Sequence, residues 1–228
     1  MRKSNGILKI FIAFCLGYLL VIALRLEDIA MYLKPLLLPF LLYTVYIHKI
    51  FETKKLLLTA LFFSWLGDCV LLFSDQGDLY FIIGLVLFLI AHFFYIILFT
   101  KQKSQPLLQN KSGFWLGFVA VSAYLFGFLA LLLPKLGKLK LPVIIYALTI
   151  SIMLLSALKG WLRWKKESRH YILTGAALFV LSDSILAVDK FYVTVPLATF
   201  WIMTTYLTAQ LLLTYGILKM NKKQITLH

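Results

Sequence analysis

Long apolar runs alternate with short polar connections along the whole chain. Each run is close to the roughly 20 residues that an α-helix needs to cross a bilayer core of about 30 Å. The apolar positions are continuous within each run rather than alternating, which favours helices over the strands of a membrane β-barrel. The pattern predicts an all-α, polytopic membrane protein, with residues 1–228 as one integral membrane domain. Its eight transmembrane helices are expected at roughly 7–24, 35–48, 55–73, 79–100, 113–133, 141–159, 170–188 and 194–218.

The composition agrees with this pattern. Hydrophobic residues make up 62% of the 228 residues and the mean hydropathy is +0.92, whereas a soluble domain is about half apolar. A soluble chain of this length would also have to cover its surface with polar groups. The first residues resemble a signal peptide. No small-x-small cleavage site precedes a soluble domain, so the first run is expected to remain as a helix.

The positive charge lies mainly between the apolar runs. A formal net charge of +14 would suggest nucleic-acid binding in a soluble protein, but basic residues in these connections act as topology determinants. With the N-terminus inside, eight crossings place 17 of the 23 lysine and arginine residues on that side. This asymmetry predicts that both termini are cytoplasmic, in the inner membrane if the host is a bacterium. No nucleic-acid partner is expected.

Two aspartates interrupt otherwise apolar runs. Asp68 stands in S-W-L-G-D-C-V-L-L-F, and Asp183 stands in F-V-L-S-D-S-I-L-A-V-D-K-F. A carboxylate at membrane depth is costly, so it needs a partner, a water-filled cavity or a proton. Each lies about five residues before the outer end of its predicted helix, on the order of 7 Å below the edge of the apolar layer. This shared depth favours a functional role for the two acids. The alternative is that each acid has a partner, for example Lys34, and only fixes helix packing.

Other polar side chains are expected to reach the same region. Lys34 begins the second predicted helix from the outer side, and Tyr146 lies near the outer start of the sixth. The remaining candidates for substrate binding are Ser182, His92, Tyr95, Tyr206 and Gln210. Each has an ordinary structural alternative, because a lysine can snorkel to the interface, a lone histidine can pack, and tyrosine or glutamine can link helices.

Motifs of several other reaction classes do not occur in the sequence. It has no H-E-x-x-H, no paired cysteines, no P-loop and no G-x-S-x-G elbow. Neither a metal nor another cofactor is therefore expected. Cys15 and Cys69 fall inside apolar runs, as buried free thiols would. Asp75, Asp78 and Asp189 fall in outer loops or at helix ends, where solvation or capping explains them.

A weak internal repeat is also visible. The second predicted helix opens L-K-P-L-L-L-P and the sixth opens L-K-L-P-V-I-I, while the third and seventh each carry one aspartate. Two parallel four-helix halves would explain both observations, as parallel repeats do in some transporters.

Five short segments together resemble the YhhN-like lysoplasmalogenases, a family of small multi-spanning membrane proteins. The segments are K-P-L at 34–36, L-G-D at 66–68, G-L-V-L-F-L-I-A-H-F-F-Y at 84–95, F-V-L-S-D-S-I-L-A at 179–187 and Y-L-T-A-Q at 206–210. One departure is Asp189, where the family usually carries asparagine. A role is therefore not carried over to Asp189, whereas Asp183 is unaffected.

The resemblance implies an eight-helix hydrolase whose substrate is a lysophospholipid of the lysoplasmalogen class. Its products would be a fatty aldehyde and a glycerophospho-alcohol. Vinyl-ether hydrolysis needs a proton on the β-carbon, an oxocarbenium ion that water captures, and collapse of the hemiacetal. One carboxyl group would donate the proton while the other, ionised, stabilises the cation and activates water, by the logic of glycoside hydrolysis. Lys34 would meet the phosphate. Which aspartate donates, the preferred head group and the oligomeric state stay open.

Three other classes of protein also stay open. A proton-coupled or lipid transporter uses intramembrane acids too, although only Pro39 lies clearly inside an apolar run. An intramembrane aspartyl protease would need G-x-G-D, and Trp65 stands where its first glycine should be. A non-catalytic scaffold predicts that loss of either acid impairs folding alone. Aldehyde release by the purified protein separates the hydrolase from all three.

Overall fold

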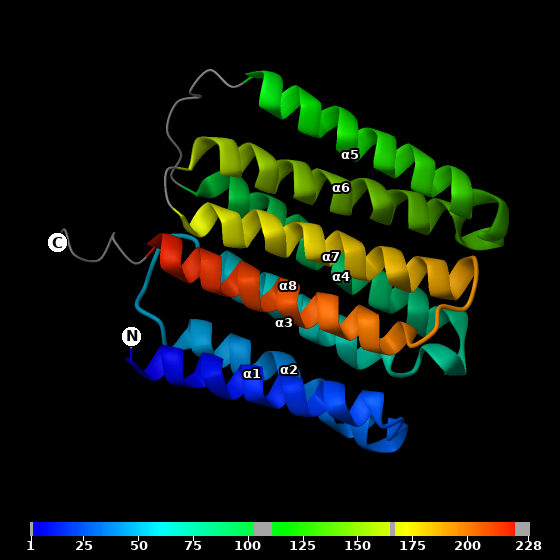
Figure 1. Ribbon diagram of the computed structural model, residues 1–228, viewed down its shortest axis with the longest axis horizontal. Coiled ribbons are helices and arrows are strands. Elements are labelled where there is room, and N and C mark those ends of the chain that lie inside the picture. Colours follow the sequence, from blue (N-terminus) through cyan, green and yellow to red (C-terminus); the bar gives the residue numbers. More distant parts are fainter. Residues whose placement is uncertain (1, 103–110, 165–166, 222–228) are drawn as a thin grey trace. The chain divides into compact units, whose positions relative to one another are not determined.

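The computed structural model describes residues 2–102, 111–164 and 167–221 (Figure 1). Within these ranges the regular secondary structure is entirely helical, so the all-α prediction is confirmed. The α-helices are α1 (Arg2–Ala23), α2 (Glu27–Tyr46), α3 (Lys54–Leu71), α4 (Asp78–Lys101), α5 (Lys111–Leu132), α6 (Lys140–Arg163), α7 (Ser168–Phe191) and α8 (Ala198–Asn221). Three single-turn 3-10 helices lie between them: η1 (Ser74–Gln76), η2 (Leu133–Lys135) and η3 (Gly137–Leu139).

In the part of the chain that the structure describes, 6 helices are long and apolar enough to cross a membrane. The other two are α3 and α8. α3 carries three charged residues, Lys54, Lys55 and Asp68, and threonine, tyrosine and glutamine residues lower the mean hydropathy of α8. The chain is therefore an integral membrane protein by its helices, and the crossing of α3 and α8 stays a prediction.

The second helix begins two turns earlier than the sequence predicted. It starts at Glu27 rather than at residue 35, because Glu27 and Asp28 complement the positive end of the helix dipole in the first turn. Pro35 and Pro39 both lie inside the helix. Lys34, which was expected at the start of this helix, lies two turns inside it and is half-buried.

The chain forms two compact units, and the boundary between them falls inside α4. The first unit runs to Phe94, and the second runs from Tyr95 to Met220. This division does not confirm the two four-helix halves that the weak repeat suggested. In the first unit α2 packs against α1 and α3, and its Leu37, Leu38 and Leu41 are fully buried. In the second unit α6 packs against both α5 and α7 (Figure 1).

A core cluster in the second unit sits where the chain passes from α5 to α6. It consists of Leu132, Leu136 and Val143, and Ala187 of α7 packs against it. Residues one turn apart share a helix face. Tyr146 lies one turn from Val143 on α6, and Asp183 lies one turn from Ala187 on α7. The cluster therefore holds α6 and α7 together beside the candidate site.

Candidate functional site

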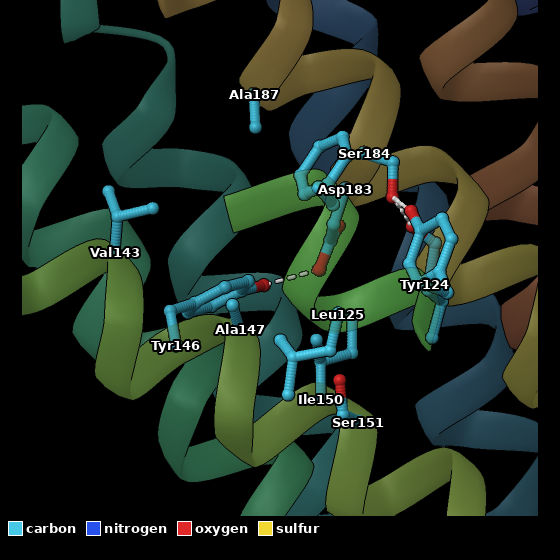
Figure 2. Close-up of a pocket in the computed structure, with 12 residues that line it drawn as sticks. Tyr124, Leu125, Val143, Tyr146, Ala147, Ile150, Ser151, Asp183, Ser184 and Ala187 are labelled. Carbon is cyan, nitrogen blue, oxygen red and sulfur yellow. Dashed lines mark hydrogen bonds between the residues drawn. The ribbon is translucent and has the colours of Figure 1, made fainter. Parts of the chain in front are cut away.

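A small pocket surrounds the side chain of Asp183 in the second unit, between α5, α6 and α7 (Figure 2). Its cavity volume is about 40 Å³. The lining is mostly apolar, and its polar side chains are Tyr124, Tyr146, Ser151, Asp183 and Ser184. Among the residues described, no group of three His, Cys, Asp or Glu side chains that could hold a metal ion occurs.

Tyr146 donates a hydrogen bond from its hydroxyl group to Asp183 Oδ2, at 2.5 Å. Figure 2 shows the tyrosine on α6 pointing across the pocket toward the carboxylate on α7. Tyr146 is 9% exposed, and Asp183 is half-buried. A hydrogen bond to a carboxylate is roughly twice as strong as one between two neutral groups. The structure therefore brings together two of the predicted site residues.

A second hydrogen-bonded pair lies in the same pocket. Tyr124 of α5 and Ser184 of α7 share a short hydrogen bond (Figure 2). Ser184 donates its own hydroxyl proton to the carbonyl oxygen of Val180 at 2.5 Å, so Tyr124 is the donor of the pair. Neither residue was among the predicted substrate contacts.

Ser182 points elsewhere. It is buried and donates to the carbonyl oxygen of Ile202 on α8 at 3.1 Å. Successive residues on a helix are separated by about 100° of rotation, so Ser182 and Ser184, on either side of Asp183 in the sequence, face different helices. Ser182 links α7 to α8, while Asp183 and Ser184 line the pocket.

Three other predicted residues form a separate buried network in the second unit. Tyr95 donates to Gln210 Oε1 at 2.6 Å, and Gln210 Nε2 donates to the Tyr206 hydroxyl at 3.4 Å. All three side chains are buried. Their polar atoms bond to one another, which is the arrangement expected of an interhelical link. The geometry therefore favours the structural alternative for these three residues.

Asp68 belongs to the first unit, where it lies on α3 and is 4% exposed. Tyr18 of α1 lies within its electrostatic reach. Cys69 lies within the reach of both Asp68 and Lys34. Its burial places Asp68 in the packed interior of its unit. A pairing of Lys34 with an acid stays a prediction.

His92 also belongs to the first unit. It lies on α4 and is fully buried. Asp68, Lys34 and His92 are thus predicted site residues of the first unit, and Asp183, Tyr146, Ser182, Tyr95, Tyr206 and Gln210 are those of the second. A cavity shared by Asp68 and Asp183 stays a prediction.

The two acids lie at different distances from the ends of their helices. Asp68 is about one turn before Leu71, the end of α3, and Asp183 is about two turns before Phe191, the end of α7. The sequence ended the seventh helix near residue 188. Asp189 lies in the last turn of α7, and its Oδ1 accepts a hydrogen bond from the Val195 N–H at 2.8 Å. This bond ties down the connection after α7, in agreement with a structural role for Asp189.

The sequence profile of the YhhN family matches residues 29–217. The chain belongs to the YhhN family. The matched region contains every predicted site residue, from Lys34 to Gln210. The resemblance in the five short segments is therefore confirmed over most of the chain.

Curated relatives share this region. The lysoplasmalogenase TMEM86A of Bos taurus is 33% identical over 162 residues, which are 68% of this chain and 61% of the relative. The lysoplasmalogenase TMEM86B of Rattus norvegicus is 34% identical over 169 residues, 72% of this chain and 62% of the relative. The lysoplasmalogenase of Mycobacterium tuberculosis is 30% identical over 173 residues, 74% of this chain and 62% of the relative. The chain spans about three-fifths of the length of these relatives. No solved structure matches it.

Proposed function

We propose that this member of the YhhN family is a membrane hydrolase that cleaves the vinyl-ether bond of lysoplasmalogens. Relatives named lysoplasmalogenase in mammals and mycobacteria support this reaction. The observation on this chain that carries the proposal is the position of Asp183. It is an ionisable side chain on an apolar helix, and it lines a small pocket. The products are a fatty aldehyde and a glycerophospho-alcohol.

The proposed substrate reaches such a site from the bilayer itself. A lysophospholipid keeps its alkenyl chain among the helices and its head group at the outer lipid level. Lys34 is proposed to meet the phosphate, because it is a half-buried cation that, like Asp68, lies within electrostatic reach of Cys69. We propose that His92 and the network of Tyr95, Tyr206 and Gln210 shape the surroundings of the substrate's alkenyl chain.

The proposed chemistry uses Asp68 and Asp183 as an acid–base pair, with neither a metal nor another cofactor. One acid protonates the β-carbon of the vinyl ether, and the other stabilises the oxocarbenium ion and activates water.

Aldehyde release in detergent tests the function directly. The purified protein should release a fatty aldehyde from a vinyl-ether lysolipid and should not cleave the ester lysolipid with the same head group and chain length. A proton-coupled or lipid transporter, the runner-up because it also uses intramembrane carboxylates, would release none. Folded protein that produces no aldehyde from any vinyl-ether lysolipid would remove the hydrolase proposal.

A further inference from the structure

The pocket beside Asp183 has room for water molecules. A water molecule needs roughly 10–15 Å³ of such volume and two to four polar partners. The cavity volume of about 40 Å³ therefore accommodates two or three water molecules. Asp183, Ser151 and the two tyrosine hydroxyl groups of the lining supply polar partners within an otherwise apolar wall.

The hydrogen bond from Tyr146 orients the Asp183 carboxyl group in the pocket. A tyrosine hydroxyl has one proton, and Tyr146 gives it to Asp183 Oδ2. A carboxylate that accepts this bond keeps further lone-pair sites for a water molecule. Tyr124 differs, because its hydroxyl is bonded to Ser184.

We propose that the pocket beside Asp183 holds the water that adds to the substrate and that Asp183 is the member of the acid pair that accepts a proton from this water. Tyr146 is the residue that positions the Asp183 carboxylate for this step. The assignment rests on the proposed hydrolase function and deepens it. Asp68 is then the acid that carries the proton.

The protons balance over one turnover. Asp68 gives its proton to the β-carbon as the π electrons form the new C–H bond, which leaves an oxocarbenium ion. Water from the pocket adds its oxygen to the cationic carbon while Asp183 accepts one water proton, and a hemiacetal results. Asp68 then takes the hydroxyl proton of the hemiacetal, and Asp183 returns its proton to the departing glycerol oxygen as the C–O bond breaks. The aldehyde leaves with both acids in their starting forms.

The first test compares kcat and KM of Tyr146→Phe and Tyr124→Phe in the aldehyde-release assay. Loss of the Tyr146 hydroxyl withdraws the donor that orients the Asp183 carboxyl group in the pocket. The value of kcat should therefore fall by at least about tenfold while KM changes little, because positioning acts on the reaction step. Tyr124→Phe keeps the bond to Asp183 and should lower kcat less than Tyr146→Phe does. An equal fall of kcat in the two folded variants, or a change in KM alone in Tyr146→Phe, overturns the assignment.

The second test does not depend on a tyrosine variant. In D2O, an enzyme that protonates carbon but adds water slowly returns the cation to the vinyl ether, which leaves deuterium on the β-carbon of recovered substrate. Asp183→Asn should raise the ratio of deuterium exchange to aldehyde release by at least about tenfold over wild type. Asp68→Asn should lose exchange and release together. An unchanged ratio in Asp183→Asn, or exchange that persists only in Asp68→Asn, overturns the assignment. If wild-type protein releases no aldehyde, the proposed function itself fails.

Discussion

Trp65 donates its indole N–H to the carbonyl oxygen of Pro35 at 2.8 Å and so joins α3 to α2 within the first unit. The helix cannot satisfy this carbonyl itself, because the residue four places on is Pro39, which has no N–H. An unsatisfied backbone carbonyl is costly in a membrane, where water is excluded. Trp65 therefore compensates for a proline inside α2, one turn before Asp68 on its own helix.

Trp65→Phe keeps an aromatic ring and removes the donor. The free energy of unfolding should fall by about 1–3 kcal/mol, the usual cost of leaving a buried polar group unsatisfied. Thermal unfolding in detergent, followed by circular dichroism, measures the change. Pro39→Ala is the matched rescue, because alanine restores an N–H for the Pro35 carbonyl. Trp65→Phe should cost less in that background, and an equal cost in both would mean that Trp65 acts through packing alone.

Gly67 precedes Asp68 at the point where α3 meets α4. A Cβ at this position would lie 2.7 Å from the ring of Phe88, which is only 6% exposed and has little room to move. Gly67→Ala should therefore lower the free energy of unfolding by about 1–3 kcal/mol, as overpacked cores do. Gly17→Ala in α1 is the control, because nothing lies within 4 Å of a Cβ there. Similar losses of melting temperature in the two variants would contradict the close contact at Gly67.

The helices were predictable from the sequence because most of them are apolar runs of the length that a bilayer requires. Their ends were less predictable, because local polar contacts decide them. Glu27 and Asp28 begin α2 two turns before the apolar run, and α7 continues to Phe191. Hydropathy also describes α3 poorly, since two of its charges are lysines in the first turn.

The candidate site was predictable as residue types but not as contacts. The cost of burying an acid singled out Asp68 and Asp183. Tyr124 carries no such signal, because a tyrosine in an apolar run is ordinary. The pairing of Tyr146 with Asp183 joins residues 37 apart, and the opposite direction of Ser182 depends on how α7 rotates against its neighbours. Both follow from the packing of helices, which a single sequence does not reveal.

The distribution of basic residues predicts that both termini are cytoplasmic. Cysteine labelling in sealed cells tests this, in a background in which Cys15 and Cys69 are replaced by serine. Val193→Cys, in the connection between α7 and α8, should react with an impermeant maleimide from outside. Lys222→Cys should react only after permeabilisation. The reverse pattern would overturn the topology.

His48 lies just after α2 ends at Tyr46. Partial burial lowers the pKa of His48 below its ordinary value. The contact of its Nδ1 with the Lys49 carbonyl opposes this shift, and the Lys54 ammonium group adds to it. Lys54 also donates to the carbonyl oxygens of Tyr46 and His48, at 2.7 and 2.6 Å. His48 is therefore neutral, and the positive charge at this end of α2 belongs to Lys54, which caps the helix carbonyl groups.

This arrangement predicts a loss of stability in mild acid. The unfolded chain takes up a proton at His48 near pH ~6.5, while the folded protein resists it. The contribution of His48 to stability is therefore flat above that pH and falls as the pH drops through and below it. His48→Gln should reduce the drop in melting temperature between neutral and mildly acidic pH. Equal drops in the variant and the wild type would show that His48 is not a source of the acid sensitivity.

The two proposed catalytic acids are tested by single and double replacement with asparagine. Asparagine keeps the shape and can still form hydrogen bonds, but it cannot give or take the proton. Asp68→Asn and Asp183→Asn should each lower the rate of aldehyde release by at least about 10²-fold, in the range of general acid–base catalysis.

The double variant should lose little more than either single variant, because the acids act as one unit. Folded yield should be preserved, since a neutral amide is cheaper to bury than a charge. Asp189→Asn is the matched control. Its amide oxygen can still accept the Val195 N–H, so its rate should stay near that of the wild type. A well-folded Asp68→Asn or Asp183→Asn protein with near-normal turnover would make that acid structural and the diacid mechanism wrong.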